Sequence, residues 1–297
     1  MQHGFNVVSL PSDSPVSLQS DAAASADVVF LCVGGILGHE GLDRVNITLP
    51  PPQPALVEAA IAAAGPKLVL VLVNGEPVAI DEYVGRIDTI VEALEGGQSA
   101  GTALAEIVLG EVSPSGVLPF TMYPASFVDE RRMDNYDMRG DSTTPGLTYR
   151  FYRDTPVFEF GHGLSYVGWG IKWGTGMPAA TASAATLRRG LALPVTVTNT
   201  GNLPGSAVGK FAGAAKVVQL FLKVLVGHDS PPLKTLVAME KVMVEKGESA
   251  HVMLNTSAVA GTCAFCVVDA AGESSIKAGN RYQLSVASEA FTVTASA

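Results

Sequence analysis

The sequence is poor in charged residues, which make up 16% of its 297 positions, and it contains no cluster of lysine and arginine. Its apolar share of 47% supplies ample material for sizeable cores, so an intrinsically disordered chain is excluded. Residues 1–175 carry 9 basic and 21 acidic side chains, whereas residues 176–297 carry 10 and 7. Because phosphate contacts need clustered basic side chains, we expect no nucleic-acid partner.

The sequence also lacks a long uninterrupted apolar run. Residues 54–75 are apolar, but Gly65-Pro66 divides them into a helix-like half and a strand-like half. The first fifteen residues contain neither the basic region nor the apolar region of a secretory signal. We therefore expect no membrane span and no signal peptide in this chain.

Cysteine is scarce as well. Cys32, Cys263 and Cys266 are too few for a disulfide framework. Cys263 and Cys266 have the spacing of redox and zinc motifs, but no second Cys/His pair accompanies them. We expect small buried or edge thiols at these positions, and no metal site.

What the first half does contain is an alternation of apolar strands and helices. Continuous apolar runs closed by glycine, asparagine or proline predict buried strands, and the stretches between them predict helices. The expected strands are 27–33, 67–73, 86–93 and 117–123, and the expected helices are 55–64 and 99–109. This order predicts βαβ units in a mostly parallel sheet. Four strands are few for such a sheet, so we expect a partial, N-terminally truncated α/β domain.

The pattern then changes twice. Residues 124–166 form a polar and aromatic segment, and a loop of that length is usually functional. Residues 174–190 are rich in small residues and predict a linker, after which short alternating strands predict an antiparallel β-sandwich. The expected domains are therefore 1–173 and 191–297, joined by the linker 174–190.

Charged residues gather directly after the first predicted strand, at Glu40, Asp43 and Arg44. In a parallel sheet, ligands bind beyond the carboxyl ends of the strands. An Asp–Arg pair there is suited to holding sugar hydroxyls, and a glutamate with a raised pKa could act as a general acid. A solvated loop with a surface ion pair explains the same residues, and the sequence leaves both interpretations open.

Aromatic and basic residues alternate between 145 and 166, and they include Tyr149 and Arg150. Such residues suit stacking against a sugar, but they equally suit an ordinary domain interface. Within Gly161-His162-Gly163, His162 has no second ligand nearby in the sequence, so we expect a tight turn.

Four ordered motifs resemble the C-terminal region of glycoside hydrolase family 3, and in particular its β-xylosidase/α-arabinofuranosidase branch. They are EGLDRVNITLP (40–50), PSGVLPFTMYP (114–124), PGLTYRFY (145–152) and PVFEFGHGLSY (156–166). Residues 195–249 resemble the fibronectin type III-like domain that closes such enzymes. The resemblance implies a partial α/β three-layer sandwich followed by an all-β immunoglobulin/fibronectin III-like sandwich.

The resemblance also implies an activity, which is exo-acting, retaining hydrolysis of terminal β-xylosyl or arabinosyl residues of xylan-type oligosaccharides. In the family a barrel supplies the aspartate nucleophile and a loop of the α/β domain supplies the acid/base. Relatives carry a further glutamate where this chain has Gly38, so Glu40 is the acid/base candidate, with Asp43, Arg44, Tyr149 and Arg150 as weaker sugar-binding candidates. No cofactor or metal is implied.

The resemblance further implies a secreted protein, a plant-cell-wall glycan as ligand and the barrel domain as partner. Since this stretch contains no barrel, we expect little or no activity from it alone. The alternative is a non-catalytic carbohydrate-binding or interaction module that uses the aromatic segment and the β-sandwich.

Overall fold

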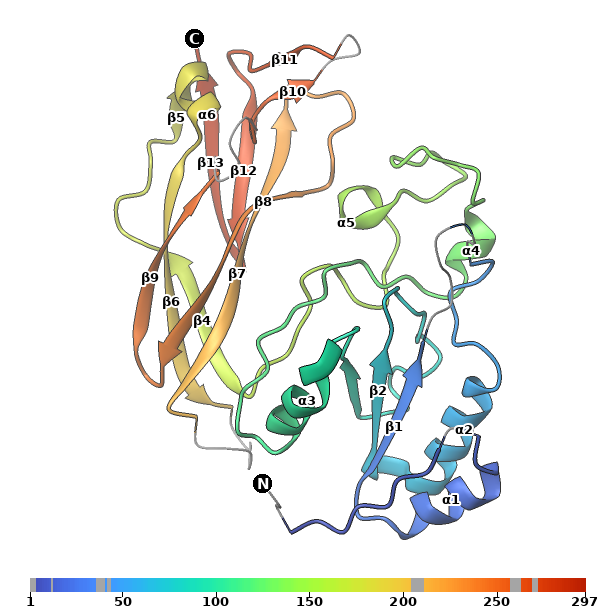
Figure 1. Ribbon diagram of the computed structural model, residues 1–297. Coiled ribbons are helices and arrows are strands. Elements are labelled where there is room, and N and C mark those ends of the chain that lie inside the picture. The colour runs from blue at the N-terminus through green and yellow to red at the C-terminus, as the bar shows by residue number, and fades with distance from the viewer. Residues whose placement is uncertain are drawn as a thin grey trace. The chain divides into compact units, whose positions relative to one another are not determined.

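A computed structural model describes residues 4–11, 13–35, 41, 44–203, 211–256, 263–268 and 272–297. These residues form two compact units (Figure 1). The first unit consists of Met1–Leu104, Met122–Asn135 and Thr155–Phe158. The second consists of Ala105–Thr121, Tyr136–Asp154 and Glu159–Ala297.

The first unit is a mixed α/β structure. Its strands are β1 (Val29–Gly34), β2 (Leu68–Val73) and β3 (Thr89–Glu92). Its helices are α1 (Val16–Ser25), α2 (Gln53–Ala64), α4 (Phe127–Glu130) and the short 3-10 turns η1 (Gly65–Lys67) and η2 (Gly97–Ser99). Helix α3 (Ala100–Val108) crosses from the first unit into the second.

The three strands form a parallel sheet in the order β1-β2-β3. Strand β2 lies in the centre, and Leu68, Leu70, Val71 and Leu72 are at most 1% exposed. A strand covered on both faces needs a continuous apolar run, and residues 68–73 supply one. The predicted parallel sheet is confirmed for three of its four strands.

Helix α2 covers this sheet because one of its faces is apolar. Leu56, Val57, Ala60 and Ala64 are its buried residues, and they follow the spacing of a single helical face. The helix contacts α1, β1 and β2. Gly65-Pro66 ends it, as the sequence predicts.

The prediction of a fourth strand at 117–123 is wrong. This segment forms only an isolated bridge, between Met122 and Phe158. Its other backbone partner is the Gly161-His162 turn, where Leu118 accepts from the Gly161 N–H and donates to the His162 carbonyl. Pro119 has no N–H to give to a ladder, which explains why an apolar run of strand length does not continue as a strand here.

The second unit consists mainly of β-strands. Its longer strands are β4 (Val167–Trp173), β6 (Ala192–Asn202), β7 (Gly213–Val226), β8 (Thr235–Glu245), β9 (Ser249–Asn255), β12 (Arg281–Val286) and β13 (Glu289–Ser296). The shorter elements are α5 (Thr148–Phe151), β5 (Thr181–Ser183), α6 (Ala184–Arg189), β10 (Val267–Val268) and β11 (Ser274–Ser275).

Two sheets share the core of this unit. One has the order β5-β13-β12-β7-β8 and the other the order β4-β6-β9, with antiparallel pairing throughout except between β5 and β13. Alternate residues of strands in both sheets meet in one apolar cluster, which includes Val195, Val218, Leu254 and Leu284. The antiparallel β-structure expected after residue 190 is confirmed, and its fibronectin III-like identity stays a prediction.

The units do not follow the predicted domain ranges. Strand β4, within the predicted first domain 1–173, pairs with β6 in the second unit. The predicted linker 174–190 contains β5 and α6, and Leu187 of α6 is fully buried. The Ser183 hydroxyl caps α6 by accepting from the Thr186 N–H. An alanine-rich stretch therefore forms ordered structure because one leucine anchors it in the core.

The prediction of thiols at Cys263 and Cys266 is also wrong, because the two residues form a disulfide. A turn in which Cys266 N–H donates to the Cys263 carbonyl brings their Cα atoms to 5.3 Å, within the range a disulfide needs. Cys32 is a free, exposed cysteine.

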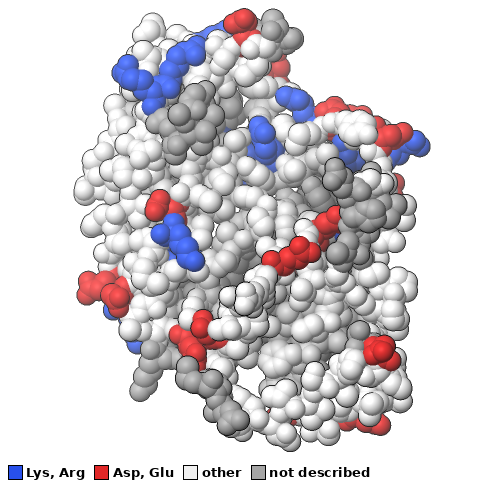
Figure 2. Space-filling model, in the orientation of Figure 1, with Lys and Arg blue, Asp and Glu red and all other residues white. Residues whose placement is uncertain are grey.

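Charged side chains gather in small separate groups on the face drawn in Figure 2, and much of the described surface between them is uncharged. In the part of the chain that the structure describes, no helix has both the length and the apolar character that a membrane crossing requires.

Candidate functional site at the carboxyl edge of the parallel sheet

Strand β1 ends in a tightly held glycine. The Gln53 side chain brackets Gly34, accepting from its N–H at 2.8 Å and donating to its carbonyl at 2.7 Å. Gly34 has a φ of 125°, and a Cβ built on it would overlap the backbone carbonyl of Val73 in β2. The next residue, Gly35, donates its N–H to that carbonyl. The chain thus leaves β1 from a fixed point.

Arg44 fixes the other end of the loop that follows β1. Its Nε lies 2.6 Å from Oε2 of Glu76, and its Nη1 donates to the Pro77 carbonyl at 2.9 Å. The Arg44 side chain is only 14% exposed, whereas the Glu76 side chain is 44% exposed. Arg44 therefore ties its loop to the turn that follows β2, so the interpretation as a purely surface ion pair does not hold for it.

The turn after β2 is organised by Asn74. This side chain is 1% exposed, and its Nδ2 donates to the Glu76 carbonyl at 2.7 Å. Its Oδ1 is buried and has no hydrogen-bond partner among the described residues. A buried amide oxygen with no partner is costly, so it marks a position where a donor would be favoured.

Strand β3 ends in Glu92. Its Oε1 accepts from the Leu94 N–H at 3.2 Å, and its Oε2 is buried without a partner in the described part of the chain. Burial raises the pKa of Glu92 to about 7, although the Leu94 backbone N–H and the nearby Asn74 amide group act in the opposite direction. Glu92 is thus a carboxyl group that gains or loses its proton near neutral pH.

A second glutamate follows β3 closely. The carboxyl group of Glu95 lies against Gly75, where an added Cβ would be 3.0 Å from the Glu95 Cδ. Together, Arg44, Asn74, Glu76, Glu92 and Glu95 stand just beyond the carboxyl ends of the three strands, and we call them the carboxyl edge. Parallel sheets bind their ligands at such an edge.

Of the predicted site residues, Glu40 and Asp43 lie outside the described residues, so their predicted roles stay predictions. Gly41 and Arg44, their described neighbours in the sequence, belong to the same connection between β1 and α2.

Tyr149 and Arg150 belong to the second unit, whereas Arg44 belongs to the first. The Tyr149 ring stacks on Phe160 at 4.2 Å and meets Phe221 edge-on, and its hydroxyl accepts from the Leu236 N–H. The Arg150 guanidinium lies 5.5 Å from the Phe151 ring. These contacts give Tyr149 a packing role within its unit. The predicted sugar contacts of Tyr149 and Arg150 stay predictions.

Sequence reasoning missed Asn74, Glu92 and Glu95. The available signal was their position, because Asn74 directly follows the run KLVLVLV and Glu92 follows IDTIV. Polar residues at the ends of buried parallel strands fall on the ligand edge, so the ends of all three strands, and not the first alone, are candidate positions.

Residues 9–166, which are more than half of the chain, match the family described as "Glycosyl hydrolase family 3 C-terminal domain". The chain belongs to glycosyl hydrolase family 3. The matched range includes the whole carboxyl edge together with α2, which covers the sheet. The expected family is thereby confirmed.

Curated members of family 3 with similar sequences include both xylosidases and glucosidases. "Beta-xylosidase/alpha-L-arabinofuranosidase 1" of Medicago sativa subsp. varia is 41% identical over 150 residues, which are 48% of this chain and 19% of the relative. "Probable beta-glucosidase J" of Aspergillus fumigatus is 32% identical over 256 residues, which are 82% of this chain and 28% of the relative. The chain thus spans well under half the length of these family-3 proteins.

A solved family-3 structure has the same fold. It is a "GH3 exo-beta-xylosidase" in complex with a xylobiose aziridine activity-based probe, with a TM-score of 0.80 and 24% identity. The superposition covers 99% of this chain and 39% of that one.

The raised pKa of Glu92 predicts a pH-dependent stability. Since the unfolded chain loses this proton near pH 4.5 and the native chain near 7, the native state is destabilised as pH rises through that window. Allowing for partial exposure, the cost above pH 7 is about 2 kcal/mol. Glu92→Gln should therefore be more stable than the unmodified chain by about that amount at pH 8, and equal to it at pH 4. Urea unfolding of both proteins across this range measures the difference, and a constant difference would contradict the burial of this carboxyl.

Proposed function

We propose that this chain forms the C-terminal part of an exo-acting, retaining family-3 glycosidase that removes terminal β-xylosyl or arabinosyl residues from xylan-type oligosaccharides. The observation that carries the proposal is the anchored Arg44, which ends the charged stretch after β1 and is held at the carboxyl edge of a family-3 domain. Glu40, four residues before Arg44, serves as the general acid/base. Asp43 and Arg44 shape the loop or bind sugar.

The chemistry needs a second carboxylate. Retaining hydrolysis uses a nucleophile and an acid/base about 5–5.5 Å apart, and the acid first protonates the leaving oxygen and then activates water. An aspartate of a barrel domain would supply the nucleophile, so the barrel is the proposed partner. The 297 residues alone would then bind or position sugar without forming the covalent intermediate.

Support for xylosyl specificity comes from the relatives. "Beta-D-xylosidase 3" of Arabidopsis thaliana aligns with 94% of this chain at 30% identity. Glucosidases align nearly as well, so glucosides are the competing substrate class. We further propose that the second unit is the fibronectin type III-like domain of such enzymes and that the protein acts outside the cell in xylan breakdown.

The test is an assay of this chain, purified as it stands, on 4-nitrophenyl β-D-xyloside and 4-nitrophenyl β-D-glucoside. We expect no release of 4-nitrophenol above buffer, because the nucleophile is not on this chain. Turnover that disappears in Glu40→Gln would contradict that expectation and place both carboxylates within these residues. Calorimetric binding of xylohexaose without turnover, unaffected by Glu40→Gln, would favour a binding module.

A further inference from the structure

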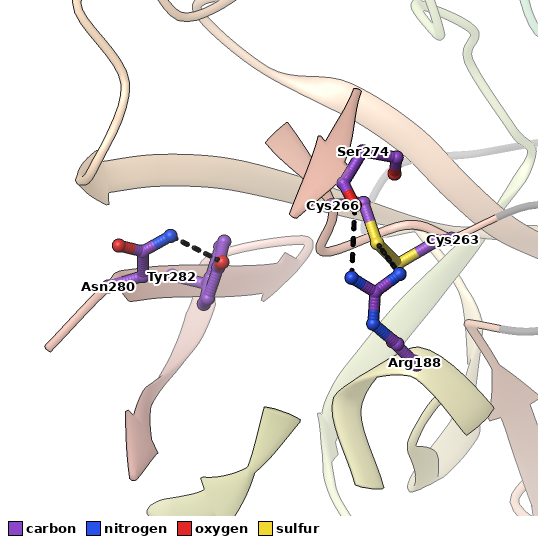
Figure 3. Close-up of a disulfide and its surroundings, with 6 residues drawn as sticks. All are labelled: Arg188, Cys263, Cys266, Ser274, Asn280 and Tyr282. Atoms are coloured by element: carbon purple, nitrogen blue, oxygen red, sulfur yellow. Dashed lines mark hydrogen bonds between the residues drawn. A yellow bond between two sulfur atoms is a disulfide. The ribbon is translucent and has the colours of Figure 1, made fainter. Parts of the chain in front are cut away.

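Phe265 and the partly buried Ala264 anchor the disulfide turn at residues 263–266 in the core. Phe265, between the two cysteines, is 1% exposed and packs edge-on against Tyr282 with ring centroids 5.2 Å apart. Asn280 Nδ2 donates to the Tyr282 hydroxyl at 3.1 Å and so holds that ring (Figure 3). Cys263 and Cys266 themselves are half-buried. The disulfide therefore lies at the boundary between core and solvent, where a small thiol can reach it.

Arg188 contacts one of the two sulfur atoms. Its Nη1 lies 3.5 Å from Sγ of Cys266, and its Nη2 donates to the Ser274 carbonyl at 3.0 Å (Figure 3). The second hydrogen bond fixes the guanidinium beside Cys266. Helix α6 positions Arg188, which is 78 residues from Cys266 in the sequence, and β11 supplies the carbonyl that holds the guanidinium beside this sulfur.

A cation next to one sulfur makes a disulfide asymmetric. A positive charge stabilises a thiolate, and a sulfur that leaves as a stabilised thiolate leaves faster. Attack by an external thiol is therefore favoured at Cys263, since the departing electron pair then resides on Cys266 beside Arg188. A disulfide with a purely structural role needs no such neighbour.

We propose that Cys263–Cys266 is a thiol–disulfide exchange site for dithiol reductants, with Arg188 as the residue that stabilises the leaving thiolate of Cys266. One thiolate of the dithiol attacks Sγ of Cys263, the S–S bond breaks, and a mixed disulfide forms with Cys263. The second thiolate of the dithiol then attacks the first sulfur of the same dithiol, which is bonded to Cys263 in the mixed disulfide. The bond to Cys263 breaks, and the Cys263 thiolate is released. The dithiol is oxidised to a disulfide, and the two cysteines take up the two protons that it lost.

The exchange has a local structural consequence. In the reduced state, the turn that carries Phe265 into the core would lose its covalent closure and keep the backbone hydrogen bond from the Cys266 N–H to the Cys263 carbonyl. The adjacent strand pair β10–β11 is joined to the turn at Val267. Reduction would therefore loosen this corner of the sandwich while leaving the two large sheets intact.

The test is the rate of disulfide reduction in the native chain by dithiothreitol, measured by trapping thiols and counting them by mass. The count should rise from one, contributed by Cys32, to three without unfolding. Arg188→Gln should slow the reduction by about three- to tenfold. Arg189→Gln removes the same charge from the next residue and should leave the rate unchanged, and Arg188→Lys should restore part of it.

Equal rates in Arg188→Gln and Arg189→Gln would overturn the proposal, as would reduction that requires urea. If Arg188→Gln does not fold, the unmodified chain provides a second readout. After reduction, alkylation of Cys266 should be half-maximal at a pH below the ordinary cysteine value of about 8.5 and below that of Cys263. Alkylation of Cys266 at or above the pH for Cys263 would also overturn the proposal.

Discussion

Gly34→Ala should lower the free energy of unfolding by about 4 kcal/mol or more, which is exceptional for the addition of one methyl group. The new Cβ would overlap the backbone carbonyl of Val73, and a backbone carbonyl in the central strand of a sheet cannot move aside. The φ of 125° adds strain for any residue with a Cβ. The change would force β1 and β2 apart where the carboxyl edge begins.

Gly35→Ala is the matched control for this prediction. Gly35 also has a positive φ, of 102°, but among the described residues no atom lies within 4 Å of a Cβ built there. It should therefore cost only the backbone strain, about 1–2 kcal/mol. Urea unfolding of both variants separates the cost of the steric overlap with Val73 from the cost of the backbone strain. Equal losses would show that the close approach of β1 to β2 is not what requires a glycine at Gly34.

The sheet and the sandwich could be predicted because their signals are local. A central parallel strand needs a continuous apolar run and a half-exposed strand needs alternation, and residues 68–73 and 192–202 show these two patterns. The segment 117–123 shows the same apolar character and forms no strand, because what it pairs with is decided by distant residues such as Phe158 and His162. A single run of sequence does not determine which distant segment it pairs with.

The candidate site was predictable in part. The charged loop after β1 stood out because its residues are adjacent in the sequence, and Arg44 is indeed held at the carboxyl edge. Glu92 and Asn74 belong to the same edge but come from different strands, so only the parallel register brings them near it. The pKa of Glu92 could not be predicted either, since burial raises it and burial is a property of the fold.

The disulfide shows the same limit at shorter range. Two residues separate Cys263 from Cys266, and a metal pair, two thiols and a disulfide all fit that spacing. The turn geometry distinguishes them, and Phe265 sets that geometry by inserting into the core.

The largest expected effect belongs to Glu40→Gln in a protein where this chain is joined to a family-3 barrel. General acid catalysis contributes about 10²–10⁴-fold, and its contribution depends on how much the leaving group needs a proton. The alcohol that leaves from xylobiose needs one, whereas 2,4-dinitrophenolate leaves readily without it. Glu40→Gln should therefore affect the two substrates unequally.

The most direct test of the proposed role of Glu40 is kcat/KM for xylobiose and for 2,4-dinitrophenyl β-D-xyloside in that joined protein, with and without Glu40→Gln. We expect a loss of about 10³-fold on xylobiose and less than about tenfold on the dinitrophenyl glycoside. Equal losses on the two substrates, or no loss on xylobiose, would contradict the assignment of the acid/base to the loop that Arg44 anchors.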